Sequence, residues 1–450
     1  MKKSYEIDMC HGPLLGKLFI FALPLMGSGI LELMFNAADI IVVGRFTGAE
    51  ALAAVGATST LITSLVNIFM GVAVGVNVLA AQYYGAGDRK NVEETVHTSI
   101  LLGFFCGFCI LVVGILFAEN FLKMMSTPDD ILGQAVLYMR IYFLGMPAFM
   151  VYNFGAALLR ATGDTKRPLY FLFAAGALNV ALNLLFVIAF QMGVAGVALA
   201  TAISQTVSAA LIIRCLRKEK GVCHPEFRKL HMQREKALRI LKIGVPAGVQ
   251  SGIFSISNLM VQSAVNSFGS IAVAGITAAS NIEGFVYTAM SAVYQTALSF
   301  ISQNMGAKNY QRVSRILQLC LGIVAAIGLV IGNGTLLFGK ELLGIYSSNQ
   351  EVVAYGLMRM EVVCTTYFLC GIMDVIVGSL RGMGYSFVPM MISLLGVCGF
   401  RIVWILTVFA WEHTLFALYI SYPISWIITS VIQLICWKWI RGRYTEAISP

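Results

Sequence analysis

Charged residues are scarce in this sequence. Asp, Glu, Lys and Arg make up 12% of its 450 residues, whereas 58% are hydrophobic and the mean hydropathy is +0.81. A soluble globular protein carries about 25% charged residues, so the composition excludes that class and predicts a protein within a lipid bilayer. The apolar stretches run continuously, which excludes the alternating segments of about 10 residues that build a transmembrane β-barrel.

Several functional signatures are also absent. The chain has no Walker loop, which argues against an ATP-driven pump, and no His-Glu-x-x-His motif, which argues against an intramembrane protease. Its ten cysteines lack metal-ligand spacing and are interpreted as packing residues. Residues 1–17 are polar and the first apolar stretch contains Glu32 and Asp39, so no cleavable signal peptide is expected. We therefore expect no enzyme, no cofactor and no structural metal site.

Twelve apolar stretches are each long enough to cross a bilayer, which takes roughly 20 residues. They lie at about residues 15–43, 51–81, 95–118, 132–158, 168–190, 194–213, 240–267, 271–301, 315–338, 352–379, 386–411 and 414–437. We therefore predict an all-α integral membrane protein with twelve transmembrane helices, six in each half of the chain.

Basic residues alternate between loops. The two termini and every second loop hold 25 Lys and Arg, whereas the other loops hold only Arg45, Lys123 and Lys340. By the positive-inside rule this distribution predicts a multi-pass protein of the cell membrane with cytoplasmic N- and C-termini. Topology thus explains the net charge of +9, and no nucleic-acid partner is expected.

The two halves of the chain repeat each other. Residues 160–168 match residues 381–389 at Arg, Gly and Pro, and residues 82–86 return as 303–307. These matches predict two six-helix lobes that are parallel repeats, related by a pseudo-two-fold axis along the membrane normal. Such repeats are the usual plan of a secondary transporter.

The predicted lobes are joined by one long basic connection. We place the N-lobe at residues 1–213, a cytoplasmic linker at 214–239 and the C-lobe at 240–450. A polar linker of this kind lets both lobes insert in the same orientation. Each lobe should hold its share of one complete pathway, so we expect the chain to function as a monomer.

Prolines and glycines indicate where the helices bend and where they approach closely. Pro24 returns as Pro246 after 222 residues. Each removes a backbone hydrogen bond, so the first helix of each lobe should bend there and act as a hinge. Small residues spaced four apart, such as Gly71 and Gly75, are interpreted as positions of close helix packing.

Ionisable residues within predicted spans are the strongest functional candidates. A carboxylate at the bilayer centre costs at least about 2.5 kcal/mol, so such residues mark ion or substrate pathways or pair with each other. Asp39 lies seven residues after Glu32, two helical turns along the same face, and its sequence neighbours cannot pair with it. It therefore needs a partner from another helix or a proton. The alternative is an Asp near a helix end that only reaches the interface.

Further polar residues lie in other spans. Asn179 and Asn183 are four apart, so both amides project from one helix face, either toward a carboxylate or as interhelical hydrogen-bond partners. Glu283 is either a substrate or proton ligand or the ion-pair partner of an Arg in the same lobe. Asp374, seven residues before Arg381, lies near the cytoplasmic end of its predicted span.

These motifs together resemble the multidrug and toxin extrusion (MATE) family, across nearly the whole chain. The residues that carry the resemblance are Pro24, the segment 39–45, the paired segments 82–87 and 303–307, and the paired segments 159–164 and 380–384. The resemblance implies two six-helix lobes around a central cavity. It also implies export of organic, commonly cationic or amphipathic compounds, driven by inward H⁺ or Na⁺.

The resemblance also implies roles for single residues. Asp39 matches the first-helix carboxylate of an N-lobe cation site, and Asn179, Asn183 and Thr201 match its polar partners. Some archaeal members have a second acid where this chain has Asn183. The resemblance therefore implies coupling through one carboxylate, with H⁺ or Na⁺ binding at Asp39.

A C-lobe cation site matches this chain less well. The acids that another branch of the family uses there fall on Phe254 or Ser255 and on Cys370, with Asp374 one turn later. Glu32, Glu283 and Asp374 therefore stay as possible substrate or cavity residues. The alternative function is a flippase for lipid-linked saccharides or an exporter of another non-drug metabolite, although acids balance the few arginines in the spans.

Overall fold

The computed structural model describes residues 5–218 and 230–446 of the chain, and these residues contain helices and no β-strand. This confirms the predicted all-α fold. The first half contains α1 (Leu14–Phe46), α2 (Ala49–Gly85), α3 (Arg89–Met124), α4 (Asp129–Leu144), α5 (Met146–Ala161), α6 (Lys166–Leu184), η1 (Leu185–Ala189) and α7 (Gly193–Lys218). The second half contains α8 (Arg234–Asn266), α9 (Ser270–Gly306), α10 (Tyr310–Leu337), α11 (Gly339–Tyr346), α12 (Gln350–Gly382), α13 (Phe387–Ser393), η3 (Leu394–Gly399), α14 (Phe400–Trp404), η4 (Ile405–Phe409), α15 (Leu415–Tyr419) and α16 (Ser421–Glu446).

Ten of the described helices are long and apolar enough to cross a membrane, and the bent pair α4–α5 brings the number to eleven. The two helices of this pair meet at 46°, just before Pro147, which cannot donate the backbone hydrogen bond of a continuous helix. The predicted span 271–301 corresponds to α9, which has 37 residues like α2 but is not among the ten because it is richer in polar residues. With α9 included, the helices account for the twelve predicted spans.

The helices pack into two compact units. The first contains residues 1–8 and 27–248, and the second contains 9–26 and 249–450. These boundaries differ from the predicted lobes because α1 and α8 are each shared by both units. Residues 219–229 of the predicted linker lie outside the described residues.

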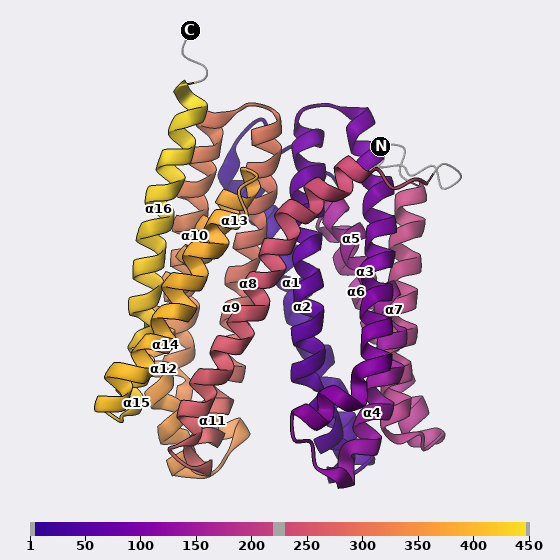
Figure 1. Ribbon diagram of the computed structural model, residues 1–450, viewed down its shortest axis with the longest axis vertical. Helices are drawn as coiled ribbons and strands as arrows, with labels where there is room; N and C mark the ends of the chain where they lie inside the picture. Colours follow the sequence, from indigo (N-terminus) through magenta and orange to yellow (C-terminus); the bar gives the residue numbers. More distant parts are fainter. Residues whose placement is uncertain (1–4, 219–229, 447–450) are drawn as a thin grey trace. The chain divides into compact units, whose positions relative to one another are not determined.

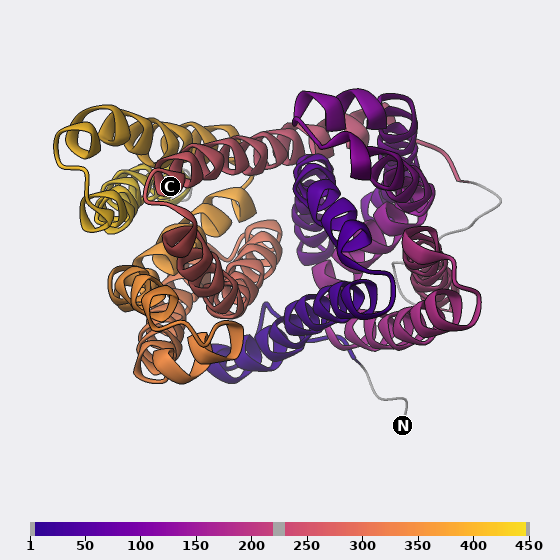
Figure 2. The same ribbon diagram turned by 90° about the horizontal axis from the view of Figure 1, so that it is seen from below.

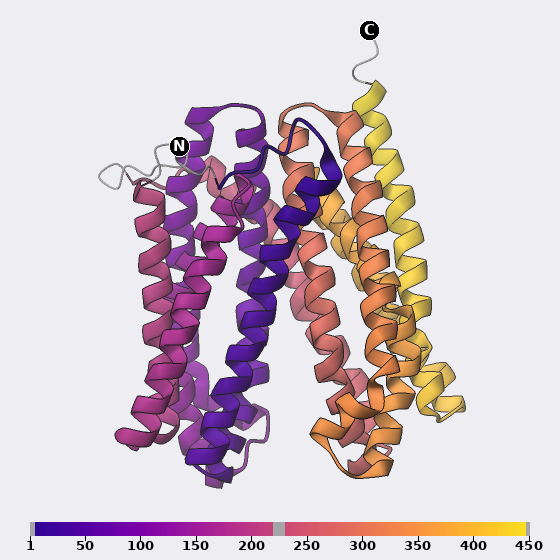
Figure 3. The ribbon, with the colours of Figure 1, turned by 180° about the vertical axis from the view of Figure 1, so that it is seen from behind.

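The first unit is organised around α5, which contacts α2, α3 and α7 and is buried along most of its length (Figures 1 and 3). Glycine allows this packing. A Cβ atom at Gly107 of α3 would overlap the backbone of Pro147 at the start of α5. The pair α6 and α7 also packs together within this unit.

The second unit is organised around α12, which contacts α9, α10 and α16 (Figure 2). Here too a glycine lets two backbones meet, because a Cβ atom at Gly328 of α10 would overlap Phe368 of α12. Central placement of α12 brings its polar residues, Arg359 and Asp374, into the interior of this unit.

The first part of α8 packs closely against α2 within the first unit. A Cβ atom at Gly71 would overlap the backbone of Gly248, and one at Gly75 would overlap the carbonyl oxygen of Ile240. This confirms the predicted close packing at these two glycines.

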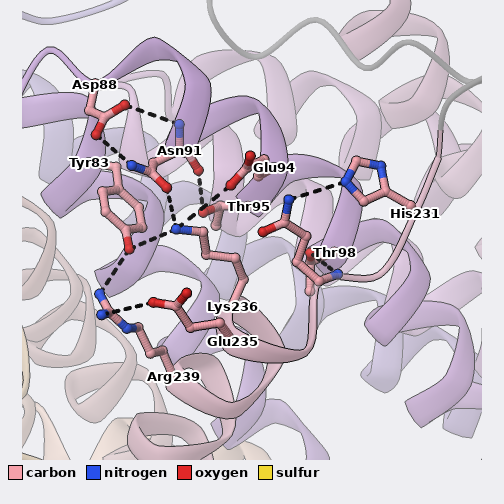
Figure 4. A network of polar contacts seen from close by, with 11 residues as sticks. Tyr83, Asp88, Asn91, Glu94, Thr95, Thr98, His231, Glu235, Lys236 and Arg239 are labelled. Carbon is pink, nitrogen blue, oxygen red and sulfur yellow. Dashed lines mark hydrogen bonds and ion pairs between the residues drawn. The ribbon is translucent and has the colours of Figure 1, made fainter.

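A polar network also joins the start of α8 to α2 and α3 (Figure 4). The buried Lys236 donates from Nζ to Asn91 Oδ1 and, over 3.0 Å, to the Tyr83 hydroxyl, and lies 3.9 Å from Glu94. Asp88 accepts hydrogen bonds from the Asn91 side chain and backbone, which lower the pKa of Asp88. The segment after the linker is thus held by specific contacts to the first unit.

Lys236→Ala should lower the free energy of unfolding of the first unit by about 1–3 kcal/mol, because Asn91 and Tyr83 lose a buried hydrogen-bond donor. The measurement is thermal or denaturant unfolding of the purified protein in detergent. Glu235→Ala is the matched control, because its ion pair with Arg239 is exposed and should contribute less than about 1 kcal/mol. Equal stability of the two variants would contradict this anchoring role.

Candidate functional site

Asp39 is the centre of a polar cluster in the first unit. Its Oδ1 accepts a hydrogen bond from Asn183 Nδ2, which crosses from α6 to α1. Asp39 forms no ion pair with any residue that the structure describes, so a neutral amide is the partner of this carboxylate. The structure therefore provides the interhelical partner that the sequence required.

The predicted polar partners come together in a chain of hydrogen bonds. Asn183 Nδ2 also donates to Asn179 Oδ1 over 3.2 Å, and Asn179 Nδ2 donates to Thr201 Oγ1 of α7 over 3.2 Å. Thr201 in turn donates to the Val197 carbonyl oxygen in its own helix. Asn179 and Asn183 are buried, and all four predicted residues therefore share one site on α1, α6 and α7.

One acceptor of this cluster is left without a donor. Asn183 Oδ1 is buried and has no hydrogen-bond partner among the described residues. A buried acceptor without a partner costs about 1–3 kcal/mol. Together with the oxygens of Asp39 and Thr201, it gives a set of oxygen ligands suited to a proton or a hard cation.

The helix that carries the two amides changes geometry directly after Asn183. Its α-helical part ends at Leu184 and continues as the π-helical segment η1. π-helical turns occur frequently at functional sites because they shift side chains relative to the regular helix. This feature has no signal in the apolar sequence of the span.

The sequence prediction missed three neighbours of Asp39. Tyr138 and Tyr142 of α4 lie close enough to interact electrostatically with the carboxylate, and their rings stack at 5.9 Å. Gln205 of α7 hydrogen-bonds Tyr142, while its own Oε1 is buried without a described partner. A usable signal existed, because Tyr138 and Tyr142, like Thr201 and Gln205, are four residues apart on their helices.

Glu32 lies outside this hydrogen-bonded chain. Its side chain is exposed, and it interacts electrostatically with Arg160 in the last turn of α5 rather than with Asp39. The structure thus separates the two carboxylates that the sequence placed on one helix face.

In the second unit the structure answers the open alternative for Glu283. Its two carboxylate oxygens accept hydrogen bonds from Nε and Nη2 of Arg359 over 2.9 and 2.8 Å, and both side chains are buried. Glu283 is therefore the ion-pair partner of an arginine from the same half. Asp374 instead hydrogen-bonds Tyr287 and interacts electrostatically with Arg381.

The comparison with known proteins identifies this architecture. A model of the MatE family matches the chain twice, at residues 24–185 and 246–407. The chain belongs to the MatE family. The two matches confirm the internal repeat, with the offset of 222 residues between Pro24 and Pro246. MatE proteins are transporters, so this protein is a multi-pass membrane transporter and not an enzyme.

Curated relatives and solved structures agree with this MatE assignment. The chain is 28% identical over 393 residues to the probable multidrug resistance protein YoeA of Bacillus subtilis, covering 85% of this chain and 84% of the relative. It is 21% identical over 372 residues to the multidrug export protein MepA of Staphylococcus aureus, covering 83% and 82%. A solved outward-facing multidrug resistance MATE transporter is similar with a TM-score of 0.89 at 19% identity, covering 99% of this chain and 100% of that one. A transporter from Pyrococcus furiosus reaches a TM-score of 0.91 at 19% identity over the full length of both chains.

Glycine at position 176 of this MatE protein lets α1 approach α6. A Cβ atom there would overlap the ring of Phe35, which lies one helical turn before Asp39. Gly176→Leu should therefore push α1 away and weaken the contact between Asp39 and Asn183. We expect modification of Asp39 by dicyclohexylcarbodiimide, followed by mass spectrometry, to become several-fold faster.

Gly56→Leu is the matched control for this experiment, because nothing lies within 4 Å of a Cβ atom at that helical glycine. Its modification rate at Asp39 should equal that of the wild type. A Gly176→Leu rate equal to both would show that this glycine does not position α1.

Glu283→Gln should lower the free energy of unfolding by about 3–5 kcal/mol, because it leaves the buried Arg359 without a counter-charge. Glu119→Gln is the control, since its pair with Lys123 is exposed and should contribute less than about 1 kcal/mol. Denaturant unfolding in detergent measures both. A loss for Glu283→Gln as small as that of the control would contradict a structural ion pair.

Proposed function

We propose that this protein is a secondary active antiporter that exports organic, cationic or amphipathic compounds in exchange for H⁺ or Na⁺, coupled through Asp39. The observation that carries the proposal is the Asp39 carboxylate, which is bonded to Asn183 and has no cationic partner among the described residues. An unpaired carboxylate inside a membrane is a functional site by default. The multidrug relatives support small organic molecules as the exported compounds.

Asn183 supplies a means of responding to the coupling ion. While Asp39 is ionised, it accepts the hydrogen bond of the Asn183 amide. A proton on Asp39 would convert this carboxylate into a donor for Asn183 Oδ1, which has no donor of its own. Na⁺ would instead be held by the oxygens of Asp39, Asn183 and Thr201. Either ion replaces the present contact between α1 and α6.

The first helix is suited to respond to such a change. Among the ten apolar helices α1 has the lowest buried share in its apolar window, 22%. Pro24 precedes by two residues the point where α1 passes from the second unit to the first, and Pro246 precedes the corresponding point of α8 by two residues. We propose these prolines as hinges that let the two units change their arrangement during transport.

The proposal includes the orientation and the assembly of the transporter. The alternating basic loops support a cell-membrane protein with cytoplasmic termini. With that orientation the coupling ion enters from outside while the organic compound leaves the cell. A single chain has both repeats and serves as a monomer.

Asp39→Asn should abolish gradient-driven efflux, with at least about a tenfold loss, because asparagine has no charge to neutralise. The measurement is ethidium efflux from proteoliposomes under an imposed proton gradient and, separately, a sodium gradient. Asp129→Asn is the matched control, because Asp129 is exposed at the start of α4.

The gradient that drives wild-type efflux identifies the coupling ion. Unchanged efflux in folded Asp39→Asn would contradict coupling through this residue. Absence of efflux in the folded wild type under both gradients would contradict drug export and favour a lipid-linked saccharide or another non-drug metabolite.

A further inference from the structure

Arg401 is a buried arginine without an acidic partner in the second unit. Only 5% of its surface is exposed, and it lies on α14 within the apolar span 387–409. Its Nε donates to Ser425 Oγ over 3.3 Å, and it forms no ion pair with any described residue. Because a charge inside the membrane is costly, it is normally paired or functional.

The surrounding aromatic rings orient the guanidinium group. It lies 3.8 Å from the ring centroid of Tyr422 and 5.8 Å from that of Trp426. Both rings and Ser425 belong to one face of α16, because they are spaced three and four residues apart. A guanidinium stacked on a ring keeps its in-plane N–H groups for a bidentate acceptor. The two terminal nitrogens of Arg401 donate to no described residue.

The acids of the same unit are already engaged. Glu283 is held by Arg359, and Asp374 hydrogen-bonds Tyr287. Arg359 also lies close enough to repel Arg401. Two guanidinium groups and one carboxylate thus leave one uncompensated positive charge in this cluster.

Arg381 of the same unit shows how a buried structural arginine is satisfied here. Its Nη1 donates to the Tyr294 hydroxyl and its Nη2 to Gln250 Oε1, both over 2.8 Å. Arg401 lacks acceptors of this kind at the corresponding nitrogens. A purely structural role therefore leaves its two terminal nitrogens unexplained.

The local helix geometry is a second, independent observation. Arg401 lies between two π-helical segments, η3 and η4, so the span is irregular on both sides of the residue. π-helical turns concentrate at functional sites. In the first unit, η1 follows the candidate Asp39 site in the same way.

We propose that Arg401 forms a binding site for the carboxylate of an aromatic organic acid. The guanidinium would bind the carboxylate through both terminal nitrogens, and Tyr422 and Trp426 would contact the aromatic ring. A monoanion matches the single uncompensated charge, whereas a phosphate dianion would exceed it. The site deepens the proposed function by adding an anionic group to the compounds exported, but its binding test does not depend on transport.

The test is equilibrium binding of radiolabelled benzoate to the purified protein in nanodiscs of neutral lipid. Wild type should bind saturably, and Arg401→Gln should weaken binding at least tenfold. Arg443→Gln is the matched control, because Arg443 also stacks on a tryptophan, Trp439, at 3.6 Å but is exposed. It should bind benzoate like the wild type.

Competition distinguishes the source of the anion. Benzoate should not be displaced by inorganic phosphate or by phosphatidylglycerol, and displacement by either at equal concentration would overturn the carboxylate site. Benzamide, which has the same shape without charge, should neither compete nor raise the melting temperature of wild type, whereas benzoate should raise it. Equal effects of benzamide and benzoate would overturn the proposal even if Arg401→Gln fails to fold.

The two proposals fail separately. Loss of benzoate binding in Arg401→Gln with normal efflux coupling in the Asp39 experiment supports both. Saturable benzoate binding that Arg401→Gln leaves unchanged overturns this site and leaves coupling through Asp39 intact.

Discussion

The structure depends on the cost of leaving polar groups unsatisfied in an apolar medium. Hydrocarbon offers no hydrogen bonds, so each backbone amide must find its partner within its own segment, and helices result. The same constraint acts on side chains. Lys236 is held by Asn91 and Tyr83, and Glu283 by Arg359. Groups that escape this pairing are therefore informative, and Asp39 and Arg401 are the two charged residues that stand out.

These two residues have opposite charge and lie in opposite halves of one repeat. At the offset of 222 residues, Asp39 corresponds to Val261 and Asn179 corresponds to Arg401. The repeat has thus kept the helices while its polar groups have diverged in sign. A carboxylate with a neutral amide partner suits a cation, whereas a stacked guanidinium suits an anion. Duplication of one fold therefore yields two chemically different sites, and each can be tested without the other.

Much of the fold and the polar cluster was predictable from the sequence. Apolar length gave the helices, and the spacing of Asn179 and Asn183 gave their common face. The sequence did not predict which unit each end of α1 and α8 packs with, because apolar periodicity carries no information about the neighbouring helix. It also left Glu283 open, since its partner Arg359 is 76 residues away. The π-helical segments and Tyr138 were missed because they depend on packing rather than on local composition.

The sharing of α1 connects the candidate ion site to the architecture. Residues before position 27 belong to the second unit, and Asp39 on the same helix belongs to the first. A helix transmits displacement along its axis because its own hydrogen bonds resist stretching, except where proline removes one of them. In α1 that weak point, Pro24, lies just before the change of unit. A change in the contact between Asp39 and Asn183 therefore acts on a segment that can bend exactly where its packing partner changes, so binding at one residue and rearrangement of whole units need only one shared helix.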